Sequence, residues 1–229
     1  MRTVLLTLLI LPLHVAAADI EPFTAHYDLR FSGLAGVAVT TLSQDGEGSF
    51  VLENRTRAKG LARLARPRDA IERSEFVVDT DRLKPVSFLS KDGTKRNKRG
   101  SSIDFDWSAS SANTQYKGET RTLNLEDGML DRQLLQIAMM SDLSNGVTDT
   151  SYTVIDRHST KTYAISVLAR ETIEVPAGSY DVVKIRRERA GSSRSSILWC
   201  APSLGYVTVK MQQLKDGKVI GTLSLTEIS

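Results

Sequence analysis

The feature that most constrains this chain is an alternation of apolar and polar side chains that recurs from residue 23 to residue 226. In its first instance, polar residues separate the apolar series Phe23, Ala25, Tyr27, Leu29 and Phe31. Alternate side chains of a β-strand point to opposite faces, so a period of two predicts a strand with one buried and one wet face. Turn sequences at 32–36 and 45–48 predict hairpins between such strands.

One segment has a helical period instead. Between Asp127 and Leu143, the apolar residues recur at the spacing of one broad helix face: Met129, Leu130, Leu134, Leu135, Ile137, Ala138 and the stretch from Met140 to Leu143. Asp127 is placed to cap the start of this helix, and Asn145-Gly146 to end it. We expect it to be the principal helix of the protein.

Short strands return in the last third of the chain, separated by turns at 176–178, 191–193 and 216–217. Many short antiparallel strands at regular spacing are typical of a barrel or of a sheet that curls on itself. The sequence contains no linker and no repeat of fixed length. We therefore predict one mainly β domain over residues 19–229, a single strongly curved antiparallel sheet or barrel-like fold with one principal amphipathic helix.

Residues 1–18 have the order of a cleavable secretory signal: a positive start, an apolar stretch from Val4 to Val15, and three alanines before Asp19. The apolar stretch is shorter than the roughly 20 residues that span a bilayer, and no second stretch of that length follows. We expect cleavage after Ala18, a periplasmic location, and no integral membrane span in the processed protein.

Composition narrows the choice of partner. The formal net charge is only +3, which, together with the export signal, argues against nucleic acid as a partner.

Cys200 is the single cysteine of the chain, so an internal disulfide is excluded. Because it follows Trp199 in an apolar run, a small buried side chain is favoured over a reactive thiol.

Several motifs occur in an order that resembles a known family. They are Phe23-x-Ala25-x-Tyr27-x-Leu29 with Gly33 and Gly36 behind it, Phe105-Asp106-Trp107, the helix from Asp127 to Met140, the turn from Val175 to Tyr180, and Trp199-x-Ala201-Pro202 before Gly205-Tyr206-Val207. Together they resemble the proteobacterial periplasmic family catalogued as domain of unknown function 3108, across nearly the whole processed chain. The resemblance implies a periplasmic curved-β domain and carries over no catalytic residue.

The residue pattern favours no catalytic site. His26 lies on the polar phase of the first strand and His158 in a turn, so surface placement explains both, with a neutral-pH base as the alternative. The sequence has no Gly-x-Ser-x-Gly elbow, no spaced histidine and cysteine cluster for zinc, and no phosphate-loop or dinucleotide glycine pattern. We predict a non-enzymatic protein with no catalytic residue, no metal ligand and no cofactor.

A curved sheet under an apolar helix forms a hollow that can hold a small apolar ligand. The helix would offer to such a ligand adaptable or apolar side chains, namely Met129, Leu134, Met139 and Met140. Packing of the same side chains against the sheet, with no ligand, is the alternative.

A second candidate binding feature is a highly charged hairpin tip at residues 91–100. It contains five cations, Lys91, Lys95, Arg96, Lys98 and Arg99, whose mutual repulsion must be relieved by solvent or by an anionic partner. The basic segment from Arg55 to Arg68 fits either a short helix or a bent strand, with Pro67 ending any helix. Whether that segment lies beside the tip is left open.

These features predict an accessory protein that binds an amphipathic or anionic envelope component, a lipid or a lipid-linked molecule, and contributes to envelope assembly or integrity. One alternative is a scaffold domain that docks another envelope protein on the basic tip or on a sheet edge. A second alternative is a hydrolase with an unrecognised carboxylate or serine site. The sequence does not define an oligomeric state.

Overall fold

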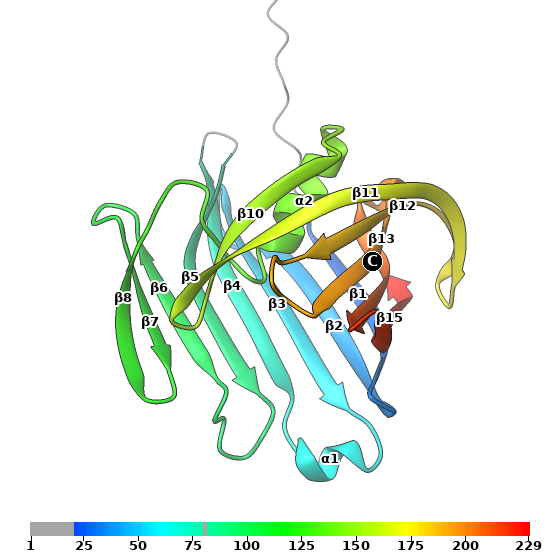
Figure 1. The fold of residues 1–229 in the computed structure, drawn as a ribbon, viewed down its shortest axis with the longest axis horizontal. Coiled ribbons are helices and arrows are strands. Elements are labelled where there is room, and N and C mark those ends of the chain that lie inside the picture. The colour runs from blue at the N-terminus through cyan, green and yellow to red at the C-terminus, as the bar shows by residue number, and fades with distance from the viewer. Residues whose placement is uncertain (1–20, 80–81) are drawn as a thin grey trace, which may run out of the picture.

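The repeated alternation produces one strongly curved β-sheet in the computed structural model, which describes residues 21–79 and 82–229 (Figure 1). Within these ranges the sheet has 15 strands, in the order β8-β7-β6-β5-β4-β3-β2-β1-β15-β14-β13-β12-β11-β10-β9. Their bounds are β1 Phe23–Phe31, β2 Leu34–Gln44, β3 Ser49–Ala58, β4 Ala70–Asp79, β5 Arg82–Asp92, β6 Ser101–Asp106, β7 Ser111–Tyr116, β8 Glu119–Asn124, β9 Leu130–Asp131, β10 Asp149–Asp156, β11 Ser159–Val175, β12 Gly178–Glu188, β13 Arg194–Ala201, β14 Val207–Lys215 and β15 Lys218–Ile228. The helices are α1 (Ala62–Ala65), α2 (Leu135–Ser144) and the 3-10 turn η1 (Pro202–Leu204).

Strands that follow one another in the chain pair antiparallel in both halves of the sheet. β1 to β8 form one meander and β10 to β15 another, and the halves join where β1 pairs with β15, with Leu29 opposite Leu223. β9 pairs parallel to β10. Since β8 and β9 are the two edges of the described sheet, it curls without closing. The prediction of a mainly β, barrel-like fold is confirmed.

The inward faces of the strands form the hydrophobic core. On β1, Ala25 and Tyr27 are buried and lie opposite Thr40 and Ala38 of β2, which are buried as well. Tyr27 donates a hydrogen bond from its hydroxyl to the carbonyl oxygen of Thr208, 3.0 Å away, so its polar end is satisfied inside the core. Cys200 lies in the same core, and burial raises the pKa of its thiol to about 11.

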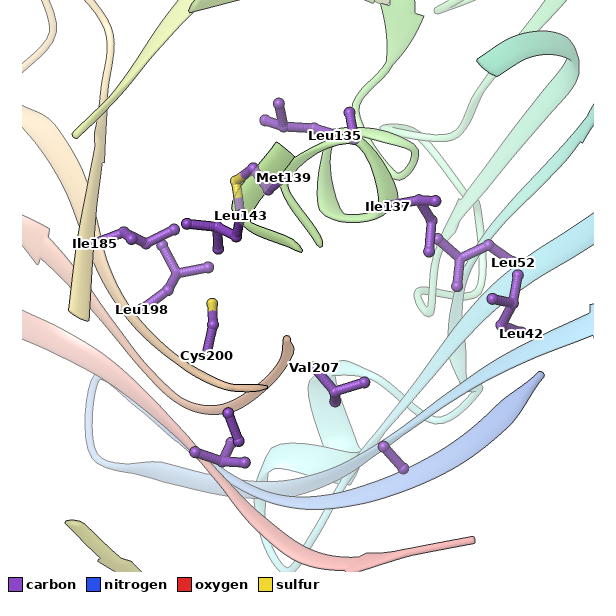
Figure 2. Close-up of a cluster of buried hydrophobic side chains, with 14 of the residues drawn as sticks. Leu42, Leu52, Leu135, Ile137, Met139, Leu143, Ile185, Leu198, Cys200 and Val207 are labelled. Carbon is purple, nitrogen blue, oxygen red and sulfur yellow. The ribbon is translucent and has the colours of Figure 1, made fainter. Parts of the chain in front are cut away.

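Helix α2 lies inside the curve of the sheet and fills it. Figure 2 shows Leu143 of the helix directed toward Ile185 and Leu198 on one wall, and Ile137 toward Leu42 and Leu52 on the other. All six side chains are buried in one continuous core. Burying a large apolar side chain contributes about 1.5–3 kcal/mol, so these contacts stabilise the packing of the helix against both walls.

The start predicted for this helix at Asp127 is wrong. Met129 lies before the short strand β9, which begins at Leu130. The helix starts at Leu135, so its N-cap is Leu134, seven residues after Asp127. The carboxylate of Asp131 accepts hydrogen bonds from the backbone N–H groups of Gln133 and Leu134, at 2.8 and 3.0 Å, and so bends the chain into the helix. Asp127 is instead ion-paired with Arg82. The predicted end is right, because the helix stops at Ser144.

A second, smaller hydrophobic cluster lies on the part of the same sheet formed by β5 to β7. Its buried members include Phe88, Ile103 and Ala112, together with Met129 and with Ile155 of β10. Ile155 follows Val154 of the main core, so the two clusters meet on β10.

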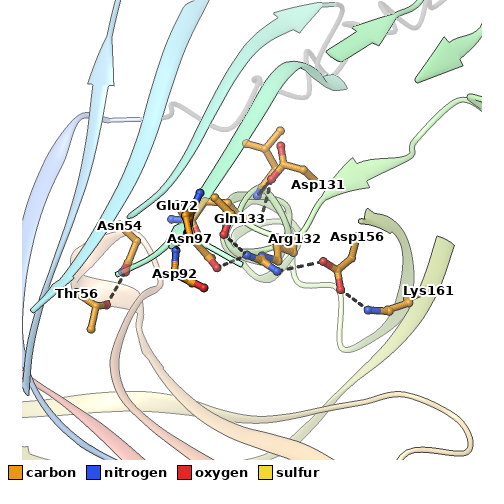
Figure 3. A network of polar contacts seen from close by, with 12 residues as sticks. Asn54, Thr56, Glu72, Asp92, Asn97, Asp131, Arg132, Gln133, Asp156 and Lys161 are labelled. Atoms are coloured by element: carbon orange, nitrogen blue, oxygen red, sulfur yellow. Dashed lines mark hydrogen bonds and ion pairs between the residues drawn. The ribbon is translucent and has the colours of Figure 1, made fainter. Parts of the chain in front are cut away.

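Polar side chains connect the end of the sheet at β9 and β10 to β4 and β5 across its interior (Figure 3). Arg132, between β9 and α2, donates to Asp156 of β10 at 3.0 Å and to Ser90 of β5 at 2.7 Å, and it pairs with Glu72 of β4 at 2.5 Å. Burial opposes the ionisation of Asp156, but Lys161 and Arg132 hold the pKa of this carboxyl below its ordinary value. We call this group, with Ser74 and Asp131, the seam network.

The segment from Arg55 to Arg68 contains a strand end and a short helix. Arg55 and Arg57 belong to β3, and α1 follows after a turn at Gly60. The helix has four residues and ends before Pro67, as the sequence indicates.

The described part of the chain contains no helix that is both long and apolar enough to cross a membrane. The expected signal at residues 1–18 lies outside the described residues and stays a prediction.

Candidate functional site

The charged tip predicted at residues 91–100 consists of the last two residues of β5 and the loop that joins β5 to β6, and its own hydrogen bonds shape it. The carboxylate of Asp92 accepts bonds from the backbone N–H and hydroxyl of Thr94 and from the backbone N–H of Arg99, at 2.9, 2.7 and 2.9 Å. Partial burial opposes its ionisation, yet these bonds hold the pKa of Asp92 below its ordinary value. The one carboxylate of the tip is therefore occupied by atoms of the loop and, within the described ranges, forms no ion pair with the neighbouring cations.

A cleft of about 730 Å³ lies between this loop and the turn that joins β7 to β8. Its lining residues are Leu89, Ser90, Arg96, Asn97, Lys98, Gly100, Ser101, Ser102, Gln115, Tyr116, Lys117, Gly118, Glu119 and Thr120. We call it the basic cleft, because Arg96, Lys98 and Lys117 line it and Glu119 is its only lining acid.

The cations of the basic cleft have few protein partners. Among the described residues, Arg96 and Lys98 form no ion pair, and Lys117 lies 5.4 Å from the ring centroid of Tyr116. Glu119 is paired with Arg121 at 2.9 Å, which neutralises the lining acid. The cleft therefore presents uncompensated positive charge to any bound molecule.

One wall of the basic cleft contains a buried serine hydroxyl that has no hydrogen-bond partner among the described residues. Ser101 is 6% exposed and lies in register between Ser90 and Tyr116 of the flanking strands. The Nε atoms of Arg132 and Arg157 are also buried and have no hydrogen-bond partner among the described residues. Arg132 bonds Ser90 through a different nitrogen, and the guanidinium of Arg157 is stacked on the ring of Tyr116. Buried polar atoms normally have a hydrogen-bond partner, so the hydroxyl of Ser101, which lines the cleft, is available to a hydrogen-bonding molecule there, whereas Arg132 and Arg157 do not line it.

The second basic segment lies directly beside the first. The backbone N–H of Arg68 donates to the carbonyl of Gly93 at 3.2 Å, and the nearby charge of Arg66 helps to lower the pKa of Asp92. Arg57 is engaged by Asp69 in two hydrogen bonds of 2.9 and 2.8 Å. Arg63, Arg66 and Arg68 form no ion pair within the described ranges, so they extend the positive surface.

The structure distributes the predicted anion-binding residues over two positions. Arg96 and Lys98 line the basic cleft, whereas Lys91 at the end of β5 and Lys95 and Arg99 on the loop are exposed and do not line it. Lys117 of the neighbouring turn was not predicted. No signal in the sequence identifies it, because its proximity depends on the pairing of β6 with β7.

The four side chains predicted to line a hollow also differ in placement. Leu134 and Met139 are buried in the main core and Met129 in the smaller cluster, so protein atoms surround them. Met140 lines a separate cavity of about 460 Å³ between α2, η1 and the end of β15. A ligand in contact with these residues remains a prediction.

The two histidines lie apart, on different elements. His26 belongs to the outward phase of β1. His158, in the turn between β10 and β11, contacts the hydroxyl of Thr114 at 2.8 Å through Nδ1 and the carbonyl of Tyr116 at 3.2 Å through Nε2. Both ring nitrogens of His158 are therefore engaged by groups other than carboxylates.

The fold defines a class of barrel-like domains built from one curled antiparallel sheet around a central helix. A solved β-barrel-like protein of domain of unknown function DUF1849 from Brucella abortus has this fold, with a TM-score of 0.57 at 12% identity over 91% of this chain and 97% of that one. The chain belongs to the family described as Protein of unknown function (DUF3108), whose model matches residues 23–224.

Weaker structural similarity extends to MucB in the Pseudomonas aeruginosa MucA/MucB complex, with a TM-score of 0.39 at 10% identity. The match covers 93% of this chain and 53% of that one. Among curated proteins, none matches this sequence.

Proposed function

We propose that this protein is a non-enzymatic accessory protein of the periplasm that binds an anionic, amphipathic envelope component through the basic cleft. The observation that carries the proposal is the lining of that cleft: among residues 21–79 and 82–229, Arg96 and Lys98 have no ion-pair partner and the buried hydroxyl of Ser101 has no hydrogen-bond partner.

A phosphate group fits this lining better than a neutral ligand does. Arginine and lysine bind phosphate oxygens with charge-assisted hydrogen bonds, which are about twice as strong as neutral ones. A serine hydroxyl adds one donor to the same oxygens. Exposed Leu89 at the cleft margin is the apolar contact that an amphipathic molecule would add.

The export signal predicted at residues 1–18 supports the choice of compartment, since an exported protein with this cleft would meet phospholipid headgroups and lipid-linked phosphates. Membership in the DUF3108 family is consistent with this role and adds no ligand of its own.

Titration calorimetry with inorganic phosphate and with a soluble short-chain phosphatidylglycerol tests the proposal. The double variant Arg96→Gln/Lys98→Gln should bind both at least about tenfold more weakly, since each charge-assisted bond is worth about 1.5–3 kcal/mol. Arg186→Gln, on the exposed face of β12, is the matched control and should bind like the original protein. Equal affinities for the double variant and the control would contradict the proposal, as would an absence of any binding.

The edge strand β8 favours a second candidate function, a docking domain for another envelope protein. β8 pairs with β7 on one side and forms one edge of the described sheet, so its outer backbone groups are free to pair with an added strand. Proline at Thr122, which lies in the middle of β8, should abolish such docking and leave phosphate binding intact. Crosslinking in intact cells would measure the docking.

A further inference from the structure

Two leucines of the α1 segment are far more exposed than the other large apolar side chains described. Leu61 is 83% and Leu64 82% exposed, whereas the next, Leu34, is 53% exposed. Residues three apart lie on one face of a helical turn, so the two leucines share a face. Ala62 is buried on the opposite side and fixes the segment against the sheet.

The α1 segment is held in this orientation by its own bonds. The backbone N–H of Arg66 donates to the carbonyl of Ala62 at 3.0 Å and closes the turn. Beyond it, Asp69 anchors the start of β4 to Arg57 of β3 through two hydrogen bonds. The leucines are therefore presented to solvent by an anchored turn.

Unpaired cations surround these leucines. Arg63, Arg66 and Arg68 belong to the same segment, and the exposed Lys95 and Arg99 belong to the adjoining loop at the same end of the sheet (Figure 1). None of the five forms an ion pair among the residues that the structure describes. Asp69 and Asp92, the carboxylates beside them, are occupied by Arg57 and by the loop backbone.

We propose that residues 59–68 dock the protein on the surface of an anionic lipid bilayer, with Leu61 and Leu64 inserted at the boundary between headgroups and acyl chains. An apolar tip flanked by cations suits such a surface, because burial of the leucines and attraction of the cations to anionic lipid add together. Two leucines form too small an apolar area for a stable protein interface, which buries about 800 Å² on each partner. Charge complementarity therefore selects lipid as the occupant.

This docking deepens the proposed function but depends on different residues. The leucines do not line the basic cleft, so the cleft can bind phosphate whether or not the protein docks. Docking would place the basic loop, and with it the cleft, beside the lipids from which an anionic amphipathic ligand is taken.

Vesicle sedimentation with the processed protein tests the docking surface. Vesicles of phosphatidylglycerol and phosphatidylethanolamine should bind it, and vesicles of phosphatidylcholine alone should not. Leu61→Ser/Leu64→Ser should lower the partition coefficient at least about tenfold. The matched control Leu168→Ser removes a leucine that is 44% exposed on β11 and should leave binding unchanged.

A second variant reports on insertion directly. The tryptophan fluorescence of Leu61→Trp should shift to shorter wavelength when anionic vesicles are added, and brominated lipid should quench it. An unshifted spectrum, or equal sedimentation of Leu61→Ser/Leu64→Ser and the original protein, would overturn the docking proposal. Phosphate affinity of the same double serine variant should stay unchanged, which separates failure of the docking surface from failure of the cleft.

Discussion

The hydroxyl of Ser74 donates a 2.5 Å hydrogen bond to the carboxylate of Asp131 inside the sheet. Ser74 lies on β4, in the first half of the sheet, and Asp131 on β9, at its far edge, so this bond fastens that half to the start of the central helix. Both residues are fully buried.

This environment predicts an unusual pH dependence of stability. Burial raises the pKa of Asp131 to about 6, so the folded protein holds a proton that the unfolded carboxyl, with its ordinary pKa of 3.8, has lost. The stabilisation from this proton is present below about pH 4 and is lost as the pH rises through 6. Asp131→Asn keeps a neutral acceptor, so its stability relative to the original should rise over that window by on the order of 2 kcal/mol. Urea unfolding of both proteins from pH 4 to 7 measures it. A constant difference would show that Asp131 titrates normally.

Removal of Arg132 should destabilise the fold strongly. Arg132→Ala would leave Asp156, whose side chain is 10% exposed, without one of its two cationic partners. It would also remove the arginine that pairs with Glu72. A truncated buried pair costs about 3–5 kcal/mol, and partial exposure of Arg132 places the expected loss near the lower end of that range. The surface pair offers the control: Arg121→Ala breaks an exposed ion pair and should cost less than about 1 kcal/mol. Denaturant unfolding of both variants gives the comparison, and similar losses would argue against the seam network.

The two neighbouring methionines of α2 should respond differently to truncation. Met139 is 2% exposed in the main core, so Met139→Ala should lower the free energy of unfolding by about 2–4 kcal/mol. Met140 lines a cavity and is only partly buried, so Met140→Ala should cost less than about 1.5 kcal/mol. Thermal unfolding of the pair tests the placement of the helix. Equal losses of stability for the two variants would mean that the helix is rotated about its axis relative to this structure.

Gly93 controls the contact between the two basic segments. Its φ is +74°, and a Cβ there would lie 2.8 Å from the carbonyl oxygen of Arg68. Gly93→Ala should therefore cost about 2 kcal/mol or more and separate the segments. Gly118 has a similar φ of +81° with nothing within 4 Å of the added carbon, so Gly118→Ala isolates the backbone strain at about 1 kcal/mol. Urea unfolding of the two variants measures the difference. Equal losses of stability would mean that the contact between Gly93 and Arg68 is unimportant.

The sequence predicts the strands well because each strand carries its own pattern. The alternation from Phe23 to Phe31 matches the bounds of β1, and its apolar positions are buried from Phe23 to Tyr27, whereas Phe31 is exposed. The helix start was misplaced because Met129 and Leu130 fit a helical spacing by chance, while the bend that precedes α2 depends on the carboxylate of Asp131.

The sites were harder to predict than the strands. Arg96 and Lys98 could be selected as a charge cluster, but the cleft also needs Lys117 and Ser101, which strand pairing brings to the same place. The seam network was missed altogether. Its members come from separate strands with no common spacing, and their meeting depends on how far the whole sheet curls.

The open seam has a mechanical consequence. A barrel closed by a ladder of backbone hydrogen bonds can open only by unzipping a row of bonds in register. Here β8 and β9 remain edges, and side chains such as Arg132 join β10, next to the β9 edge, to β4 and β5 from within. Side-chain bonds can be exchanged for water one at a time, so the diameter of the wall at this point can change while every strand keeps its neighbours.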